Sequence, residues 1–235
     1  MSKIQIIWLG HSSFKIFIGD QVILLDPWLK ENPLFPNNKL DFALSKVNYI
    51  ILSHAHSDHA SETIEYSKVC NAPIIGIYDY VNFLEKNHQV KVVGFNRGGT
   101  LKLGNVNITM VSASHSSSFY LNNKFYYGGN EAGYMIESNG RTIYFSGDTD
   151  IMADMEFFEE FHKPEIGILS AGGHFTMNME RAAYAAKKYF NFKTIIPCHF
   201  KTFPILEQNS KKMKDKLIDE NVEVIEPEIL KVIKL

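Results

Sequence analysis

The stretch Leu52-Ser-His-Ala-His-Ser-Asp-His59 gathers three histidines and one aspartate within six residues, directly after a short apolar run typical of a buried strand. In an extended segment, side chains two residues apart point the same way, so His54 and His56 converge on one side. Asp58 and His59 come where the chain turns into the next expected helix, and they can face a second point nearby. Imidazole nitrogens and carboxylate oxygens suit zinc, iron or manganese. The stretch therefore predicts a metal site.

A cluster of surface histidines is the alternative interpretation of this stretch. The chain has 9 histidines among 235 residues. With that composition, roughly fewer than one chain in a thousand contains HxHxDH by chance. We therefore favour metal ligands over surface histidines.

Residues of metal-ligating types recur where later strands are expected to end. His115 follows one such strand, Asp148 follows another within a Gly-Asp-Thr sequence, and His199 follows a third. These three strands are expected at residues 106–112, 142–145 and 194–196. Strand ends lie on rigid backbone, where a metal centre can be preorganised. Together with HxHxDH, the three residues are predicted to be ligands.

Apolar runs and turn residues divide the chain into a strand-rich first part and a second part in which strands and helices alternate. Strands are expected at residues 4–8, 14–18, 21–25, 49–52, 74–77, 91–95, 106–112, 133–137, 142–145, 166–169, 194–196, 222–225 and 229–233. Helices are expected to start at residues 61–67 and to lie around residues 78–85, 178–189 and 211–219. This order predicts an α/β fold in which two sheets are covered by helices on their outer faces.

Four local signals add to this prediction. Gly19-Asp20 indicates a hairpin turn between two strands. Asn178 is the expected cap of the helix at residues 178–189, and Pro197 is expected to end the strand before it. Residues 27–47, which hold several prolines and asparagines, predict a long connection with little regular structure.

Length and composition narrow the class of protein. With 235 residues, 45% of them hydrophobic, the chain can bury a sizeable core, and we predict one domain over residues 1–235. The net charge of −2 gives no global attraction to nucleic acid or to an anionic membrane. No apolar run approaches the roughly 18–20 residues that cross a bilayer, so we expect no membrane span.

The expected compartment is the cytoplasm. The first apolar run is about five residues long and ends at Gly10-His11, too short for a secretion signal. Cys70 and Cys198 lie far apart and form no CxxC pair, which fits reduced thiols.

In chain order, HxHxDH, a lone histidine, GDT and PxH resemble the signature of the metallo-β-lactamase superfamily. The flanking segments Gly10-His-Ser-Ser-Phe14, Leu25-Asp-Pro27 and Gly172-Gly-His-Phe-Thr-Met177 resemble a small group of metal-dependent hydrolases. That group is related to ascorbate-phosphate lactonase and, more distantly, to the phospholipase D that cleaves N-acyl-phosphatidylethanolamines. The resemblance covers residues 4–203, and its motifs are specific for the superfamily but weak for the substrate.

The resemblance implies an αββα four-layer sandwich with two metal positions at one edge. The implied ligands are His54, His56 and His115 for one metal, Asp58, His59 and His199 for the other, and Asp148 as the bridge. All seven positions hold the expected residue types. Close relatives carry tyrosine after the final histidine, where this chain has Phe200; this removes a hydroxyl but no ligand.

Such a site implies a dinuclear, lactonase-like hydrolase. Zinc is the expected metal, and manganese or iron stay open because histidine and carboxylate ligands accept several metals. Two divalent metals lower the pKa of a bridging water, so that a hydroxide can attack a small ester, lactone or phosphodiester. Asp58 is predicted to be catalytic as well as a ligand, because it can orient this hydroxide. Asp26 and Thr149 are candidates to fix the ligand imidazoles by hydrogen bonds.

Two histidines outside the ligand set have open roles. His174 lies in a Gly-rich turn that the resemblance puts over the site. It is predicted to be a catalytic general acid or oxyanion donor, and a hydrogen-bond partner of the ligands is the alternative. His11 is expected to be a buried residue that supports the site.

Residues 28–38 and residues 116–130 are candidates to shape a substrate pocket. The second segment combines aromatic residues with Lys124, and such a combination can hold an acyl chain, a sugar phosphate or a base. The same aromatic side chains are alternatively expected to cover the sheet or to form a contact in a homo-oligomer.

Other functions use the same scaffold. A nuclease of RNA or DNA is one alternative, but the chain has no basic surplus, so a small molecule is the expected partner and nucleic acid is not. An iron-dependent redox or oxygen-handling protein is another, although the sequence shows neither a flavodoxin-like segment nor a catalytic cysteine pair. A metal-stabilised module without catalysis is the third.

Overall fold

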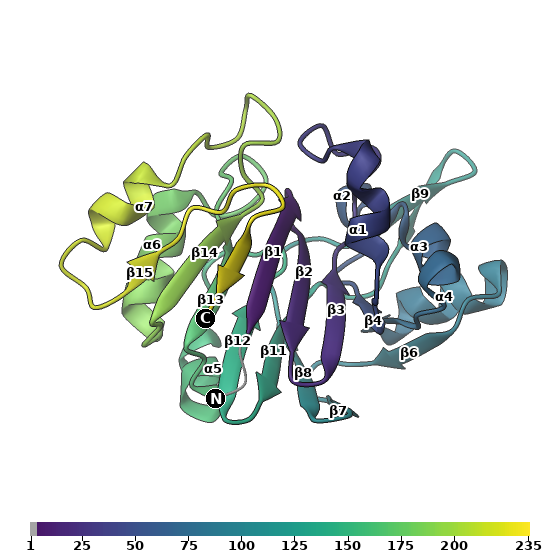
Figure 1. The fold of residues 1–235 in the computed structure, drawn as a ribbon, viewed down its shortest axis with the longest axis horizontal. Helices are drawn as coiled ribbons and strands as arrows, with labels where there is room; N and C mark the ends of the chain where they lie inside the picture. The colour runs from purple at the N-terminus through teal and green to yellow at the C-terminus, as the bar shows by residue number, and fades with distance from the viewer. Residues whose placement is uncertain (1–3) are drawn as a thin grey trace.

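Two seven-stranded sheets pack face to face in the computed structural model, which describes residues 4–235 (Figure 1). The first three residues, which belong to the predicted domain and to the segment inspected for a secretion signal, lie outside the described residues. The first sheet has the order β16-β1-β2-β3-β4-β5-β6. Its strands, in that order, are Val232–Lys234, Gln5–Gly10, Ser13–Ile18, Gln21–Leu25, Tyr49–Ile51, Ile74–Ile77 and Val92–Phe95.

The second sheet has the order β15-β14-β13-β12-β11-β8-β7. Its strands, in that order, are Glu223–Val224, Thr194–Cys198, Ile166–Ser170, Arg141–Phe145, Ala132–Ser138, Val106–Ser112 and Thr100–Leu103. A separate hairpin consists of β9 (Ser118–Leu121) and β10 (Lys124–Tyr127).

Helices lie on the outer faces of both sheets, as Figure 1 shows. On the side of the first sheet they are α1 (Leu40–Leu44), α3 (Thr63–Cys70) and α4 (Tyr78–His88), with the one-turn helix α2 (Ser57–Ala60) before α3. On the side of the second sheet they are α5 (Met155–His162), α6 (Met179–Tyr189) and α7 (Lys211–Lys216). The αββα four-layer arrangement expected from the sequence is confirmed.

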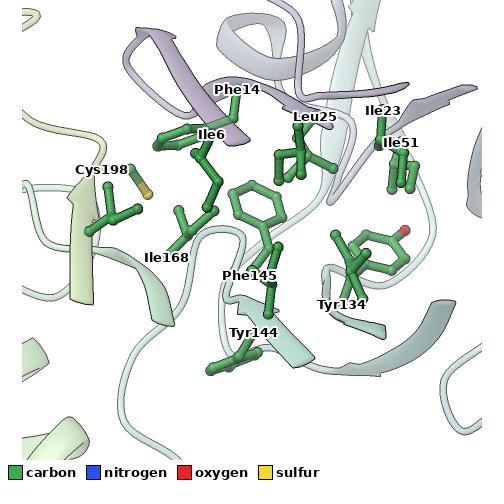
Figure 2. Packing of buried hydrophobic residues seen from close by; sticks show 14 of the residues in the cluster. Ile6, Phe14, Ile23, Leu25, Ile51, Tyr134, Tyr144, Phe145, Ile168 and Cys198 are labelled. Atoms are coloured by element: carbon green, nitrogen blue, oxygen red, sulfur yellow. The ribbon is translucent and has the colours of Figure 1, made fainter. Parts of the chain in front are cut away.

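The core lies between the two sheets (Figure 2). Phe14 of the first sheet meets Phe145 of the second edge to face, with 6.4 Å between the ring centroids. Tyr134 of β11 donates a hydrogen bond of 2.7 Å to the carbonyl of Leu52, which ties the second sheet to the segment that carries the histidines. Because strand side chains alternate, Tyr144 points the other way and packs under α5 and α6.

The structure confirms two local predictions. Gln21 pairs with Ile18 across the Gly19-Asp20 turn, so these residues close the β2–β3 hairpin. Asn178 caps α6 by accepting a hydrogen bond of 2.8 Å from the backbone N–H of Arg181.

Two other predictions need correction. The segment at residues 27–47 is mostly a connection without regular structure, as expected, but it also contains a 3₁₀ turn at Asn37–Lys39 followed by α1. Pro197 does not end its strand, because β14 continues to Cys198 and pairs with β13 throughout. The neighbouring β15 pairs only with Thr194 and Ile195, so Pro197 lies where β14 has a strand on one side, a position that proline tolerates.

Among residues 4–235, no helix is both long enough and apolar enough to cross a membrane.

Candidate metal centre

The histidine stretch lies between the end of β4 and the start of α3, at the edge of the two sheets. His54 and His59 are buried, whereas the side chain of Asp58 is 31% exposed. His115, Asp148 and His199 follow β8, β12 and β14, and the topology brings these strand ends to the same edge. The three strand-end residues and the HxHxDH stretch, far apart in the sequence, therefore meet at one centre.

The first donor group consists of His54, His56 and His115. One ring nitrogen from each lies within 4.8 Å of the others. The Nε2 atom of His54 is 2.9 Å from the Nδ1 atom of His56. The nitrogens of three rings thus converge on one point.

The second donor group consists of His11, Asp58, His59 and His199, whose donor atoms also lie within 4.8 Å of one another. The Oδ2 atom of Asp58 is 3.0 Å from Nε2 of His11, 3.7 Å from Nε2 of His199 and 3.9 Å from Nε2 of His59.

Asp148 joins the two groups. Its Oδ2 atom lies 3.0 Å from Nε2 of His199, 3.4 Å from Nε2 of His59 and 3.6 Å from Nε2 of His115. Donor atoms that share a cation through bonds of about 2.0–2.2 Å are separated by roughly 3.0–3.6 Å, so these spacings fit a metal centre. The Nε2 atom of His59 and the Oδ1 atom of Asp148 are buried and have no hydrogen-bond partner among residues 4–235, and a bound cation would supply one.

Asp26 fixes the imidazole of His59 directly and that of His54 through Ser53. It accepts hydrogen bonds from Nδ1 of His59 at 2.7 Å and from the backbone N–H and hydroxyl of Ser53 at 2.7 and 2.5 Å. The hydroxyl of Ser53 also lies 2.9 Å from Nδ1 of His54. Asp26 lies close enough to His54 and His59 to be a ligand, but its oxygens are used in these hydrogen bonds. These hydrogen bonds engage Nδ1 of His59 and Nδ1 of His54, so Nε2 of each ring is left to bind a metal.

Thr149 does not contact a ligand imidazole through its hydroxyl, which corrects its expected role. That hydroxyl accepts from the backbone N–H of Ser114 at 3.0 Å and donates to the carbonyl of Asp150 at 2.8 Å. Thr149 therefore fixes the backbone just before His115.

His11 contacts Asp58, one of the candidate ligands, which its position in the sequence did not suggest. Its Nε2 atom is 3.0 Å from Asp58 and its Nδ1 atom is 2.9 Å from the hydroxyl of Thr202. Its ring lies 3.9 Å from that of His199, centroid to centroid. Burial, together with His199, lowers the pKa of His11 to about 4, so the ring is neutral at pH 7. Only its position after a strand in Gly10-His-Ser-Ser-Phe14 could have signalled this contact.

Buried carboxylates set the charge of the centre. Burial raises the pKa of Asp148, but His199 and His59 outweigh this effect and hold it well below its usual range. Burial acts in the same way on Asp58, whose pKa is also held low by His59 and His11. Burial lowers the pKa of His199, yet Asp148 raises it to about 9. Two ionised carboxylates therefore favour positive charge among these imidazoles, as a cation site requires.

His174 lies outside both donor groups. It is exposed, its ring contacts that of Phe175, and it lines a hollow of about 210 Å³ together with His115. Asp150 and Arg181 form an ion pair in the wall of this hollow. The structure thus brings His174 beside the donor groups, with open space between it and His115.

The two pocket segments differ in outcome. Residues 118–121 and Phe125 line a groove of about 510 Å³ that also includes His56 and Asp58. Trp28, from the other segment, is buried instead and packs edge-on against the ring of His11. Phe200 is also buried and stacks on Trp8, with 5.3 Å between the ring centroids.

This chain belongs to the metallo-β-lactamase superfamily, because a family model described as the beta-lactamase superfamily domain matches residues 5–199. Its relatives define the family further. A "UPF0173 metal-dependent hydrolase" of Dinoroseobacter shibae is 51% identical over 231 residues, which cover 98% of this chain and 100% of that protein. A protein of the same description from Paracoccus denitrificans is also 51% identical, over the same shares of both chains.

A solved structure agrees with this membership. Igni18, a metallo hydrolase of the archaeon Ignicoccus hospitalis, has a TM-score of 0.88 and 28% sequence identity. The match covers 100% of this chain and 99% of that one.

Proposed function

We propose that this protein is a metal-dependent hydrolase that holds two divalent ions and cleaves a small ester, lactone or phosphodiester. One observation carries the proposal. The Oδ2 atom of Asp148 lies within 3.0–3.6 Å of Nε2 of His199, His59 and His115, so a single carboxylate faces histidines of both donor groups. The names of the relatives, all metal-dependent hydrolases, support the same class of reaction.

Each donor group would hold one ion. The proposed ligands are His54, His56 and His115 for the first ion, Asp58, His59 and His199 for the second, and Asp148 between them. Zinc is the proposed metal, with manganese and iron as alternatives that the same donor types accept. When bound, two such ions supply Lewis acidity and lower the pKa of a coordinated water toward neutrality.

Residues of the chain would orient the water and protonate the leaving group. Asp58 is ionised and partly exposed, so its carboxylate can accept a hydrogen bond from a nucleophilic water and orient it. His11 and Thr202 form a hydrogen-bonded chain behind Asp58 that limits its rotation. His174 faces the hollow beside His115, from where it can donate a proton to a leaving group.

Replacement of the shared carboxylate tests the proposal. We expect Asp148→Ala to abolish hydrolysis of bis-p-nitrophenyl phosphate and of p-nitrophenyl acetate, and to lower the metal content, because both donor groups lose their common oxygen. The far-ultraviolet circular dichroism spectrum checks that the variant is folded. Wild-type activity in a folded Asp148→Ala protein contradicts the bridging role.

A further inference from the structure

The groove of about 510 Å³ opens onto the candidate metal centre. His56 and Asp58 form part of its wall, so a molecule in the groove can reach the metal ligands. Figure 1 shows β9 above α3 and α4. Side chains from these three elements, from α2 and its flanking residues and from β10 form the rest of the lining.

Apolar side chains form the body of the groove. Ile64 of α3, Phe83 and Leu84 of α4, and Phe119 of β9 all line it. Among residues 4–235, no lysine or arginine lines the groove, and Asp58, at the metal end, is the only carboxylate in its wall. His56 and His88 are the imidazoles in its wall. A phosphate or carboxylate therefore finds no lysine or arginine along the groove, whereas an alkyl or aryl group gains from leaving water.

Contacts between aromatic rings hold the wall of the groove in place. The ring of Phe119 lies 4.7 Å from Phe83, 5.3 Å from Tyr80 and 5.6 Å from Tyr126, centroid to centroid. A hydrophobic cluster thus fixes the inner face of the β9–β10 hairpin against α4. Further out, Phe125 lines the groove and is 77% exposed, so part of its apolar surface is available to a ligand.

The base of the hairpin is tied to the metal-ligand segment. The hydroxyl of Ser117 accepts a hydrogen bond of 3.2 Å from the backbone N–H of Ala55, between His54 and His56. A Cβ atom at Gly128 would lie 2.3 Å from the Cβ of Ala55, so only glycine allows this approach. The groove and the donor groups therefore hold a fixed relative position.

The hollow that contains His174 has a different chemistry. It is lined by His115, Thr149 and the Asp150–Arg181 ion pair, and its volume is about 210 Å³. The centre is therefore flanked by a small polar hollow and a larger apolar groove, which suits a substrate with one polar end and one apolar end.

We propose that the groove binds the apolar acyl or aryl group of a neutral ester or lactone while the scissile bond lies at the donor groups. This inference rests on the proposed function, and it selects acyl substrates with an apolar arm from the classes named there.

Two series of compounds test it in the zinc-loaded protein. The first is p-nitrophenyl acetate, butyrate and hexanoate, for which we expect kcat/KM to rise by about fourfold per methylene if each is fully buried. The second is the p-nitrophenyl ethyl, butyl and hexyl ethers, which are not hydrolysed. Calorimetry should show their affinity rising along the series in the wild type and in Asp148→Ala.

Two exposed phenylalanines provide a matched pair of variants. Phe125→Ser alters the groove, whereas Phe161→Ser alters α5, where the side chain is 74% exposed and lines none of the groove. We expect Phe125→Ser to lower the hexanoate-to-acetate ratio of kcat/KM by about threefold or more, and Phe161→Ser to leave it unchanged. Phe83→Ser, deeper in the groove, should reduce hexyl ether affinity further.

The outcomes separate this inference from the proposed function. Length-dependent ether binding that Phe125→Ser weakens, in a protein that cleaves neither the p-nitrophenyl esters nor bis-p-nitrophenyl phosphate, supports the groove and contradicts the hydrolase. Hydrolysis without any length dependence, or with the same dependence in Phe125→Ser, supports the hydrolase and overturns the groove. The groove is also overturned if Phe125→Ser dissociates an oligomer in sedimentation while leaving the ether affinities unchanged, because the hairpin is then a subunit contact.

Discussion

The two ring nitrogens of His59 and of His11 contact different partners at this centre. For His59, one nitrogen binds Asp26 and the other faces Asp58 and Asp148. The sequence predicted the inward-facing residues because HxHxDH has a recognisable spacing. It named Asp26 only as a candidate hydrogen-bond partner of the ligand imidazoles, and it could not predict the contact between His11 and Asp58, which are 47 residues apart.

At the same scale, replacement of His174 tests whether its imidazole donates a proton to the leaving group. We expect His174→Ala to slow turnover and to retain the full metal content, because the imidazole lies outside both donor groups. A general-acid role typically contributes about 10²–10⁴-fold to the rate. The pH profile of kcat/KM and the metal content of the same sample are the measurements. Loss of metal in the variant contradicts this role.

Lys15 is buried, and its titration should make the free energy of unfolding depend on pH. Its ammonium donates to the carbonyls of Phe42 and Ser45, and burial lowers its pKa to about 8. Above pH 8 the folded protein has released a proton that the unfolded chain keeps until about pH 10.4. The free energy of unfolding of the wild type should therefore rise, relative to Lys15→Met, by up to about 1.4 kcal/mol per pH unit in that window.

Urea titrations of both proteins between pH 7 and pH 10 measure this difference. Below pH 8, Lys15 is charged in both states, and the full cost of burying the ammonium is present. A difference that stays constant over the whole range contradicts the lowered pKa.

At the scale of elements, long apolar-patterned strands and the capped helix α6 were predictable, whereas short helices were not. α1 has five residues, and its last turn is held by Lys15 from β2, a tertiary contact that no local pattern encodes. The β9–β10 hairpin was expected only as a pocket segment, without strands. All four residues of β10 are exposed, so its sequence lacks the apolar–polar alternation that predicts a half-buried strand.

Glu62, between α2 and α3, holds the loop that follows β3. Its carboxylate accepts hydrogen bonds from the backbone N–H groups of Leu29, Lys30 and Glu31 at 2.7, 2.9 and 2.9 Å, and from the hydroxyl of Tyr66. We expect Glu62→Gln to lower the free energy of unfolding by about 1–3 kcal/mol, because an amide nitrogen cannot accept these bonds.

The matched control is Glu65→Gln, in an exposed ion pair with Lys30, for which we expect a change within about 0.5 kcal/mol. Urea denaturation of the three proteins gives the comparison. Equal stabilities of the two variants contradict the role of Glu62.

At the scale of the whole molecule, the fold brings together residues that the sequence separates. The αββα class was predictable from the order of strands and helices and from the resemblance of the histidine motifs. The edge position of the site was predictable because the candidate ligands follow strands, and neighbouring strand ends share an edge of a sheet. The apolar groove was only partly predictable, since its walls come from α2, α3, α4 and the β9–β10 hairpin and the distances between these elements depend on packing. A single domain over residues 1–235 and a small-molecule partner stay predictions.

The metal content of the protein purified without added metal tests the central claim most directly. Elemental mass spectrometry gives the metals per chain, and the same sample is assayed with bis-p-nitrophenyl phosphate and p-nitrophenyl acetate. The proposed centre predicts about two zinc or manganese ions per chain and turnover of at least one compound. Iron alone with neither compound cleaved, or full activity after complete removal of metal, contradicts a dinuclear hydrolase.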